Sequence, residues 1–375
     1  MAGQRGARDT FSDSGAHIRD VSDQIVNVSP KLVPLLKRIG MSGRAGDNPK
    51  REWEEDVGIA LTDTISTTTT MANTSVTALH LSGDNAFNFS IGDLLLIQDE
   101  QLRVTALAGD GQLTVSRGWG STTAATHDST VAITKIGTAL PENTDTPLVG
   151  SVDLTFPYNY YTIFNKAYQV SKRQQATSIY GVSDDMDYQA AKTLEHLMLL
   201  CEKNIFYGKR VQGSATAASN FGGLDVFITD NTDTGSEALT EKKIMDLLQL
   251  CWDDVGHENL PTLIVVNAWQ KRKISDIYRP MARMDRGSTK GGVVTDRIET
   301  DLGPLEVMLD HNTPTDRLFL LNPSFIEIGP YKDSTFYTAA LPADGAYQKE
   351  HVYGDYSFQV KADKAHGSMT NLSTS

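Results

Sequence analysis

The sequence predicts an α+β protein with more than one domain. Its 375 residues exceed what one hydrophobic core usually supports. Residues 61–140 show short alternating apolar runs between turn residues, residues 183–208 show a continuous helical period, and residues 216–330 mix both patterns. We therefore expect an all-β module, then a long helix, then a mixed layer of helices and strands.

The long helix is the element around which the other segments are expected to pack. Ser183 is the expected N-cap, the aspartates after it complement the helix dipole, and Gly208 marks the end. At about 1.5 Å per residue the helix would be about 36 Å long, so another element must lie against most of it. Its apolar residues recur at spacings of three and four, on one face, and are Met186, Ala190, Leu194, Leu197, Met198, Cys201 and Ile205.

Two extended segments are the expected companions of this helix. Residues 152–174 form a tyrosine-rich run before it, and residues 352–362 alternate apolar and polar positions near the end of the chain. In the mixed layer we expect one helix after Thr240, ending at Gly256, and another over residues 268–278. Strands are expected there in LDVFIT, TLIVVN, LGPLEVML, RLFLL and FIEIG.

The charge balance argues against a general nucleic-acid-binding protein. The chain has 34 Lys and Arg against 47 Asp and Glu, a net charge of −13 that would repel DNA. No apolar run approaches the roughly 18 residues that span a bilayer, and residues 1–15 lack the apolar segment of a signal peptide. Cys201 and Cys251 lie on the inward faces of helical patterns, which predicts buried thiols in a reducing compartment rather than a disulfide.

The N-terminal segment has the opposite charge. Over residues 1–51, nine basic side chains face five acidic ones, a balance of +4. Apart from a short helix expected between Pro30 and Gly40, the segment has little periodicity. Two interpretations remain open: a disordered tail, or an arm that becomes ordered on an acidic neighbouring subunit. Apolar residues such as Trp53 favour the arm.

The sequence carries no established catalytic signature. It has no G-x-S-x-G, Walker A or G-x-G-x-x-G string and no histidines at zinc-ligand spacing. We therefore expect no catalytic residue, no metal and no cofactor. One partial match to a calcium-binding loop competes with a polar loop that caps the next helix, and its candidate ligands are Asp230, Thr232, Thr234 and Glu241. The strand expected just before this loop argues against the helix–loop–helix form that such sites require.

Several blocks of sequence outside the β module resemble a known family. They are EWEED (residues 52–56), YTIFNKAYQVSKRQQA (161–176), DYQAAKTLEHLMLLCEKNIFYG (187–208), LIVVNAWQKRKISDIY (263–278) and YGDYSFQVKADKAHGSMTNL (353–372). Their content and order resemble the major capsid proteins of tailed bacteriophages, which have the Hong Kong 97-type fold. The β module is larger than the two-stranded loop of the archetype.

The resemblance implies a division of the chain into named parts. These are an N-terminal arm (1–57), an extended loop (58–165) with an inserted β domain near residues 61–140, a peripheral domain (166–215) with the spine helix (183–208), an axial domain (216–330) and a return to the peripheral domain (331–375). The chain would then self-assemble into pentamers and hexamers of an icosahedral head around the DNA genome. A phage tail or baseplate subunit is the alternative, and an enzyme is a third.

The resemblance also implies partners and a location. The partners are other copies of the chain, a portal protein at one vertex, and separate scaffolding and decoration proteins where the particle needs them. No specific nucleic-acid site and no membrane are implied, and assembly in the host bacterial cytoplasm would place the product in the virion. The residues expected to matter for assembly are Arg5, Arg8, Arg19, Trp53, Leu194, Leu197, Met198 and Phe358.

Overall fold

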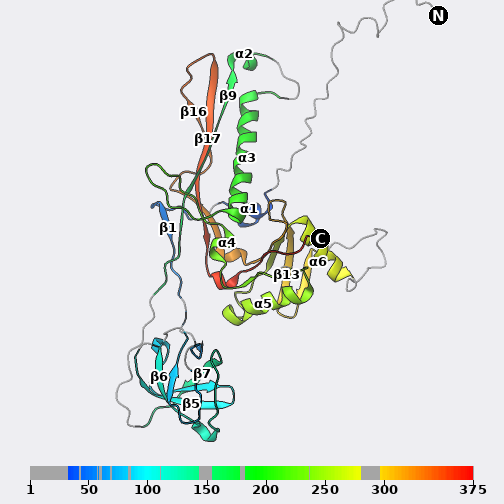
Figure 1. Ribbon diagram of the computed structural model, residues 1–375. Coiled ribbons are helices and arrows are strands. Elements are labelled where there is room, and N and C mark those ends of the chain that lie inside the picture. The colour runs from blue at the N-terminus through cyan, green and yellow to red at the C-terminus, as the bar shows by residue number, and fades with distance from the viewer. Residues whose placement is uncertain are drawn as a thin grey trace, which may run out of the picture. The chain divides into compact units, whose positions relative to one another are not determined.

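The chain divides into two compact units. One comprises Met1–Trp53 with Pro157–Ser375, and the other is Glu54–Phe156. Arg5, Arg8 and Arg19 lie outside the described residues. The computed structural model (Figure 1) describes residues 33–41, 44–56, 58, 61–67, 70–82, 86–109, 111–142, 154–177, 182–235, 237–279 and 296–374.

In the larger unit, one long helix lies along an antiparallel sheet (Figure 1). Helix α3 (Asp185–Tyr207) contacts β9 (Thr162–Ser171) and β17 (Tyr347–Val360). Strand β17 pairs with β9 along one edge, and with β16 (Tyr337–Leu341) and β15 (Ile326–Pro330) along the other. The prediction that the long helix packs against the extended run before it and the late strand is confirmed.

Helix α3 starts one residue later than predicted. The Asp184 carboxylate accepts a hydrogen bond of 2.7 Å from the backbone N–H of Met186, so Asp184 rather than Ser183 is the N-cap. Serine and aspartate cap helices about equally well, so the sequence alone could not distinguish them. At the other end, Gly208 permits a close approach, because a Cβ there would lie 2.4 Å from the Asn204 carbonyl oxygen.

The second layer of the larger unit is a six-stranded sheet in the order β10–β18–β14–β11–β13–β12. Pairs β10/β18 and β11/β13 are parallel and the other pairs are antiparallel. The strands are β10 (Thr232–Asp233), β11 (Leu263–Val266), β12 (Arg297–Thr300), β13 (Gly303–Leu309), β14 (Leu318–Leu321) and β18 (Gly367–Met369). Helices α5 (Glu241–Val255) and α6 (Ala268–Tyr278) share an apolar cluster with one face. The other face joins the cluster of α3, which explains why β11 and β14 are apolar throughout.

The predicted strand in LDVFIT is wrong. Residues Leu224–Phe227 form one turn of helix, α4, whose first and last side chains are both buried. A short apolar run fits either a buried strand or a helical turn, so its periodicity could not distinguish them. Gly223 brings this turn against α3, because a Cβ there would lie 2.2 Å from the Ile205 carbonyl oxygen.

Short elements complete the larger unit. Strand β1 (Lys50–Glu52) pairs antiparallel with β8 (Tyr158–Tyr160). The predicted N-terminal helix is α1 (Pro34–Ile39), with Pro34 in its first turn, while Pro30 lies outside the described residues. Helix α2 (Lys172–Gln175) follows β9, and the 3₁₀ turns are Pro323–Phe325 and Asp363–Ala365.

The smaller unit is a six-stranded antiparallel sheet in the order β2–β7–β4–β5–β6–β3. Its strands are β2 (Thr62–Thr64), β3 (Ala78–His80), β4 (Asp93–Ile97), β5 (Glu100–Leu107), β6 (Gln112–Ser116) and β7 (Ala132–Thr138). The alternation read from the sequence puts Leu102 and Val104 in its core, fully buried. The 3₁₀ turns are Ala86–Asn88 and Trp119–Ser121. Across the described part of the chain, every helix is too short or too polar to cross a membrane.

Candidate assembly site

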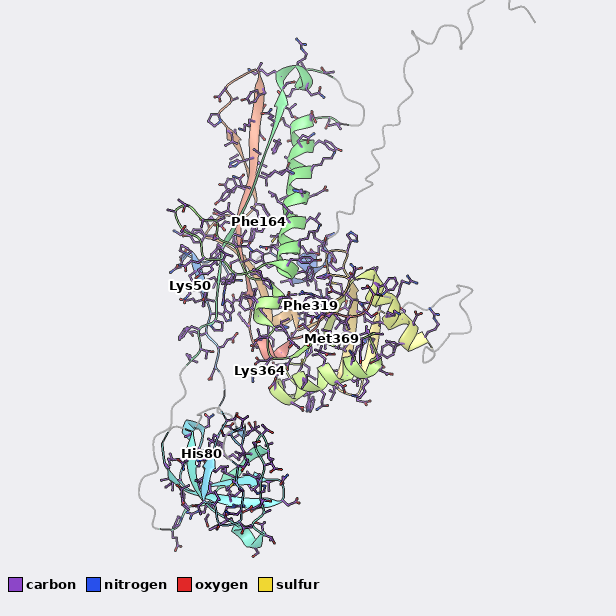
Figure 2. The ribbon with its side chains drawn as sticks, in the orientation of Figure 1. Lys50, His80, Phe164, Phe319, Lys364 and Met369 are labelled. Atoms are coloured by element: carbon purple, nitrogen blue, oxygen red, sulfur yellow. The ribbon has the colours of Figure 1, made fainter. Side chains whose placement is uncertain are left out.

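One apolar cluster holds α3 against the two larger sheets of the larger unit. Leu197 is 2% exposed and Phe358 is fully buried, and Leu194 and Met198 pack half-buried against the same cluster. Trp53 belongs to it too, with its ring 5.6 Å from that of Phe227. Phe164 and Phe319, labelled in Figure 2, are further members from β9 and β14. The structure therefore brings together all the predicted assembly residues that lie within the described chain.

A buried glutamate on the apolar face of α3 escaped the sequence analysis. Glu202 is fully buried. Its Oε2 accepts a hydrogen bond of 3.3 Å from the backbone N–H of Leu36 in α1, and its Oε1 accepts one of 3.1 Å from the Asn312 amide. A signal was available, because Glu202 lies four residues after Met198 and three before Ile205, within the apolar stripe.

A second buried carboxyl faces Glu202. Asp310, in the loop after β13, is fully buried and accepts a hydrogen bond of 2.8 Å from the backbone N–H of Asn312. Burial raises the pKa of both carboxyls, and the Asp310 carboxyl raises that of Glu202 further. The pair therefore binds a proton more readily than free carboxyls do. Since neither side chain reaches solvent, this arrangement suits a joint between α1, α3 and the β13 loop rather than chemistry on a substrate.

One of the basic side chains counted in the N-terminal segment, Arg51, is buried in the larger unit. Arg51 in β1 is 7% exposed. Its Nε donates a hydrogen bond of 3.0 Å to Gln359, and its Nη2 lies 3.4 Å from a carboxylate oxygen of Glu327. Gly329 makes room for the guanidinium, because a Cβ there would lie 2.3 Å from Nη1. Arg51 thus fixes β1 to β15 and β17.

The chain matches a known protein family along almost its whole length. The family model for the SU10 major capsid protein matches residues 3–373. The chain belongs to this family. Comparison with curated proteins gives no match.

Solved capsid structures share the fold of this SU10-type capsid protein at very low sequence identity. The Cyanophage A-1(L) capsid subunit is 11% identical with a TM-score of 0.55, over 97% of this chain and 99% of that one. The capsid of Myoviridae phage XM1 is 10% identical with a TM-score of 0.52, over 96% and 100%. The capsid of the native GTA particle is 10% identical with a TM-score of 0.52, over 98% and 99%.

These findings confirm the expected fold and role. The chain has the Hong Kong 97-type capsid fold, and its family is one of capsid-forming structural proteins. The family assignment selects the capsid over the tail or baseplate alternative.

The calcium-loop candidates do not form a helix–loop–helix site. Thr232 and Asp233 form strand β10, paired with β18, and Glu241 is the first residue of α5. Lys243 approaches the Asp233 and Glu237 carboxylates at 3.7 and 3.6 Å, which places a cation where calcium ligands would have to converge. Among the described residues, no three His, Cys, Asp or Glu side chains gather as a metal site would require. Calcium binding at this loop stays the weaker of the two interpretations, and the local geometry does not favour it.

The smaller unit contains a buried ionic network that the sequence also did not reveal. Glu100 is 1% exposed and accepts two hydrogen bonds of 2.7 Å from Arg117. His127 lies 2.9 Å from the same carboxylate, and the backbone N–H groups of Gly118 and Ala125 each donate at 3.0 Å. Burial opposes ionisation, but Arg117 and the other donors hold the Glu100 pKa at about 2. The network fastens the loop between β6 and β7 to the sheet.

Proposed function

We propose that copies of this chain assemble into pentamers and hexamers that close an icosahedral phage head around its DNA. The family match over residues 3–373 carries this proposal. Exposed apolar side chains on α3, β9 and β16 support it. Each of them is at least 41% exposed, and they are Ile163, Leu200, Tyr207 and Tyr337. Contact with neighbouring copies would remove such surface from water.

The parts of the chain take the family's roles in this proposal. Residues 1–57 act as the arm, and Arg5, Arg8 and Arg19 in it contact acidic neighbours. Residues 58–165 form the extended loop. The peripheral domain consists of residues 166–215 and 331–375, and the axial domain of residues 216–330. The β unit near residues 61–140 is an insertion in the extended loop. The net charge of −13 limits adhesion to packed DNA.

The proposed partners follow from the same roles. Besides other copies of the chain, a portal protein occupies one vertex, and scaffolding and decoration are supplied by separate proteins where the particle needs them. Assembly takes place in the host bacterial cytoplasm. The role is structural, without catalysis or a cofactor.

Electron microscopy of the purified protein under assembly conditions tests the proposal. We expect closed shells with five-fold vertices. Monodisperse monomers at every salt and protein concentration tried would contradict it.

Aspartate substitutions at three apolar positions of α3 separate folding from assembly. Leu197→Asp buries an unpaired charge in the apolar cluster and should abolish folding and particles, and Leu194→Asp should do so to a lesser degree. Leu200→Asp, at a position 41% exposed, should leave the subunit folded but prevent shells. His196→Asp places the same side chain at an exposed position and serves as the control. Normal shells from both Leu194→Asp and Leu197→Asp would show that α3 is not the spine.

A further inference from the structure

A pocket in the larger unit has a buried acidic group in its lining. The pocket has a volume of about 480 Å³ and lies among β1, β8, the start of β9, the loop over residues 212–219, and β17. Lys50, labelled in Figure 2, marks its β1 side. Asp355 of β17 lines it and is 8% exposed. The other lining side chains that matter here are Tyr160, Tyr161, Tyr331 and Ile163.

The Asp355 carboxylate has no counter-charge among the described residues. Its Oδ1 is buried and accepts no hydrogen bond from any of them. Burial alone raises its pKa to about 6, with no nearby cation to lower it. The backbone fixes its position, because its N–H donates to Ser334 at 3.0 Å and its carbonyl accepts from Tyr331 at 2.9 Å.

Two cations close to this pocket have carboxylate partners of their own, and a third, Lys332, lies 5.7 Å from the centroid of the Tyr331 ring. Arg51 contacts Gln359 and Glu327, and its guanidinium lies beside the Tyr161 hydroxyl. Lys50 pairs with Glu52. Two phenols near Asp355, those of Tyr161 and Tyr353, have raised pKa values because of burial and, to a lesser extent, the Asp355 charge. The pocket therefore presents one unpaired negative group between aromatic walls.

The shape and chemistry of the pocket select among possible occupants. One ordered water takes about 30 Å³, an order of magnitude less than the pocket. A calcium ion takes about six to eight oxygen ligands, usually with several carboxylates among them, and the described lining supplies one carboxylate. A lining of tyrosine, isoleucine and one buried acid suits a long aliphatic side chain that ends in a cation. The exposed apolar surface of Ile163 (57%) at the pocket and of Val211 (45%) beside Gln212 of its lining indicates that the occupant arrives on a protein surface.

We propose that this pocket receives a Lys or Arg side chain from a second copy of the chain and that the cation pairs with Asp355. The inference rests on the proposed function, because the second copy is the neighbour in the shell. Asp355 is then a residue that weakens the isolated subunit and stabilises the assembled one. A buried charge pair formed across an interface gives both affinity and register.

Photochemical cross-linking in assembled particles identifies the occupant. We would place p-benzoylphenylalanine at Tyr160 in the pocket wall and assemble shells from equal amounts of ¹⁴N- and ¹⁵N-labelled protein. The expected product is a peptide pair that mixes the two labels and joins position 160 to a site at or next to a Lys or Arg. Intact shells that give only same-copy links, or links far from any basic residue, would overturn the inference and leave the shell function standing.

Asp355→Asn gives a second, independent test through two stabilities of opposite sign. In the unassembled chain at pH 8 the substitution removes an unpaired buried charge, so the melting temperature should rise by about 5 °C. In particles it removes the partner of the incoming cation, so dissociation should be about tenfold faster. The control Asp333→Asn makes the same charge change at an exposed site nearby. A loss of stability in both states, or an unchanged dissociation rate, would show that Asp355 does not bind a neighbouring cation.

Discussion

The two units bury carboxylates in opposite ways. In the smaller unit, Glu100 is surrounded by Arg117, His127 and two backbone N–H groups, and its pKa is held at about 2. In the larger unit, Glu202 and Asp310 face each other without a Lys or Arg partner among the described residues, and burial raises the pKa of both. A buried charge with all its partners in one chain stabilises that chain under most conditions, whereas an unpaired one makes stability depend on pH or on a neighbour.

The opposite pKa shifts predict opposite responses to pH. The folded pKa of Glu100 lies below its ordinary value of 4.5. The stability it contributes is therefore complete above that value and is lost as the pH falls through 4.5 toward 2. For Glu202 and Asp310 the folded pKa values lie above the ordinary ones. Their contribution is complete at low pH and is lost as the pH rises through the folded values. A fall in pH should therefore lower the stability of the smaller unit and raise the stability of the contact between α3 and the loop after β13.

Among the substitutions of buried carboxylates and their partners, Glu100→Gln should have the largest effect, because it leaves Arg117 buried without a counter-charge. We expect the free energy of unfolding of the smaller unit to fall by about 3–5 kcal/mol. Native-state hydrogen exchange of peptides covering residues 93–127 measures this without assuming that the whole chain unfolds in one step. Asp99→Asn, at the exposed adjacent position, is the matched control. An equal effect of the two substitutions would remove the distinction between the units.

Lys135→Met should have a smaller effect in the same unit. Asp93 is 1% exposed and pairs with Lys135 at 2.6 Å, but it also accepts hydrogen bonds from Thr138 (2.9 Å) and the backbone N–H of Ser90 (2.7 Å). Those donors remain, so we expect a loss of about 1–2 kcal/mol in the same exchange measurement. Lys135→Arg keeps the cation and should change little. A loss as large as that of Glu100→Gln would mean that the remaining hydrogen bonds do not compensate the carboxylate.

Asp310→Asn should stabilise the joint in the larger unit at high pH. The new amide would still accept from the backbone N–H of Asn312 and could donate to the Glu202 carboxylate, which removes the need for a shared proton. We expect a gain of about 1–2 kcal/mol at pH 8 that shrinks toward pH 4. Hydrogen exchange of α1 and of the last turns of α3 reports it, with Asp301→Asn at an exposed site as the control. A gain that is equal at both pH values would refute the proton-linked interpretation.

Local periodicity in the sequence was enough to predict several helices and strands of the larger unit. The apolar stripe of α3, the Thr240 cap and Gly256 end of α5, and the wholly apolar strand β11 are each encoded in neighbouring residues. The turn at Leu224–Phe227 was misjudged because four residues do not establish a period. The family resemblance supplied the order of parts, which periodicity alone does not give.

The buried polar groups could not be predicted in the same way. Glu202 is separated by 110 residues from Asn312, and Arg51 by 308 from Gln359. Nothing near either residue in the sequence indicates which distant group will satisfy it. A charged residue inside an apolar helical stripe signals burial, but its partners, and hence the direction of its pKa shift, depend on tertiary structure.

The smallest expected effect comes from an exposed ion pair, which gives the baseline for the others. Lys242 and Asp246 lie one helical turn apart on α5, with side chains 83% and 58% exposed. Lys242→Ala should lower the free energy of unfolding of the larger unit by less than about 0.5 kcal/mol, because water and salt screen the pair and alanine favours helix. Hydrogen exchange of α5 measures it, and added salt should make the wild type and the variant more alike. A loss close to that of Lys135→Met would mean that the stability contributed by these ion pairs depends on the proximity of opposite charges rather than on their burial.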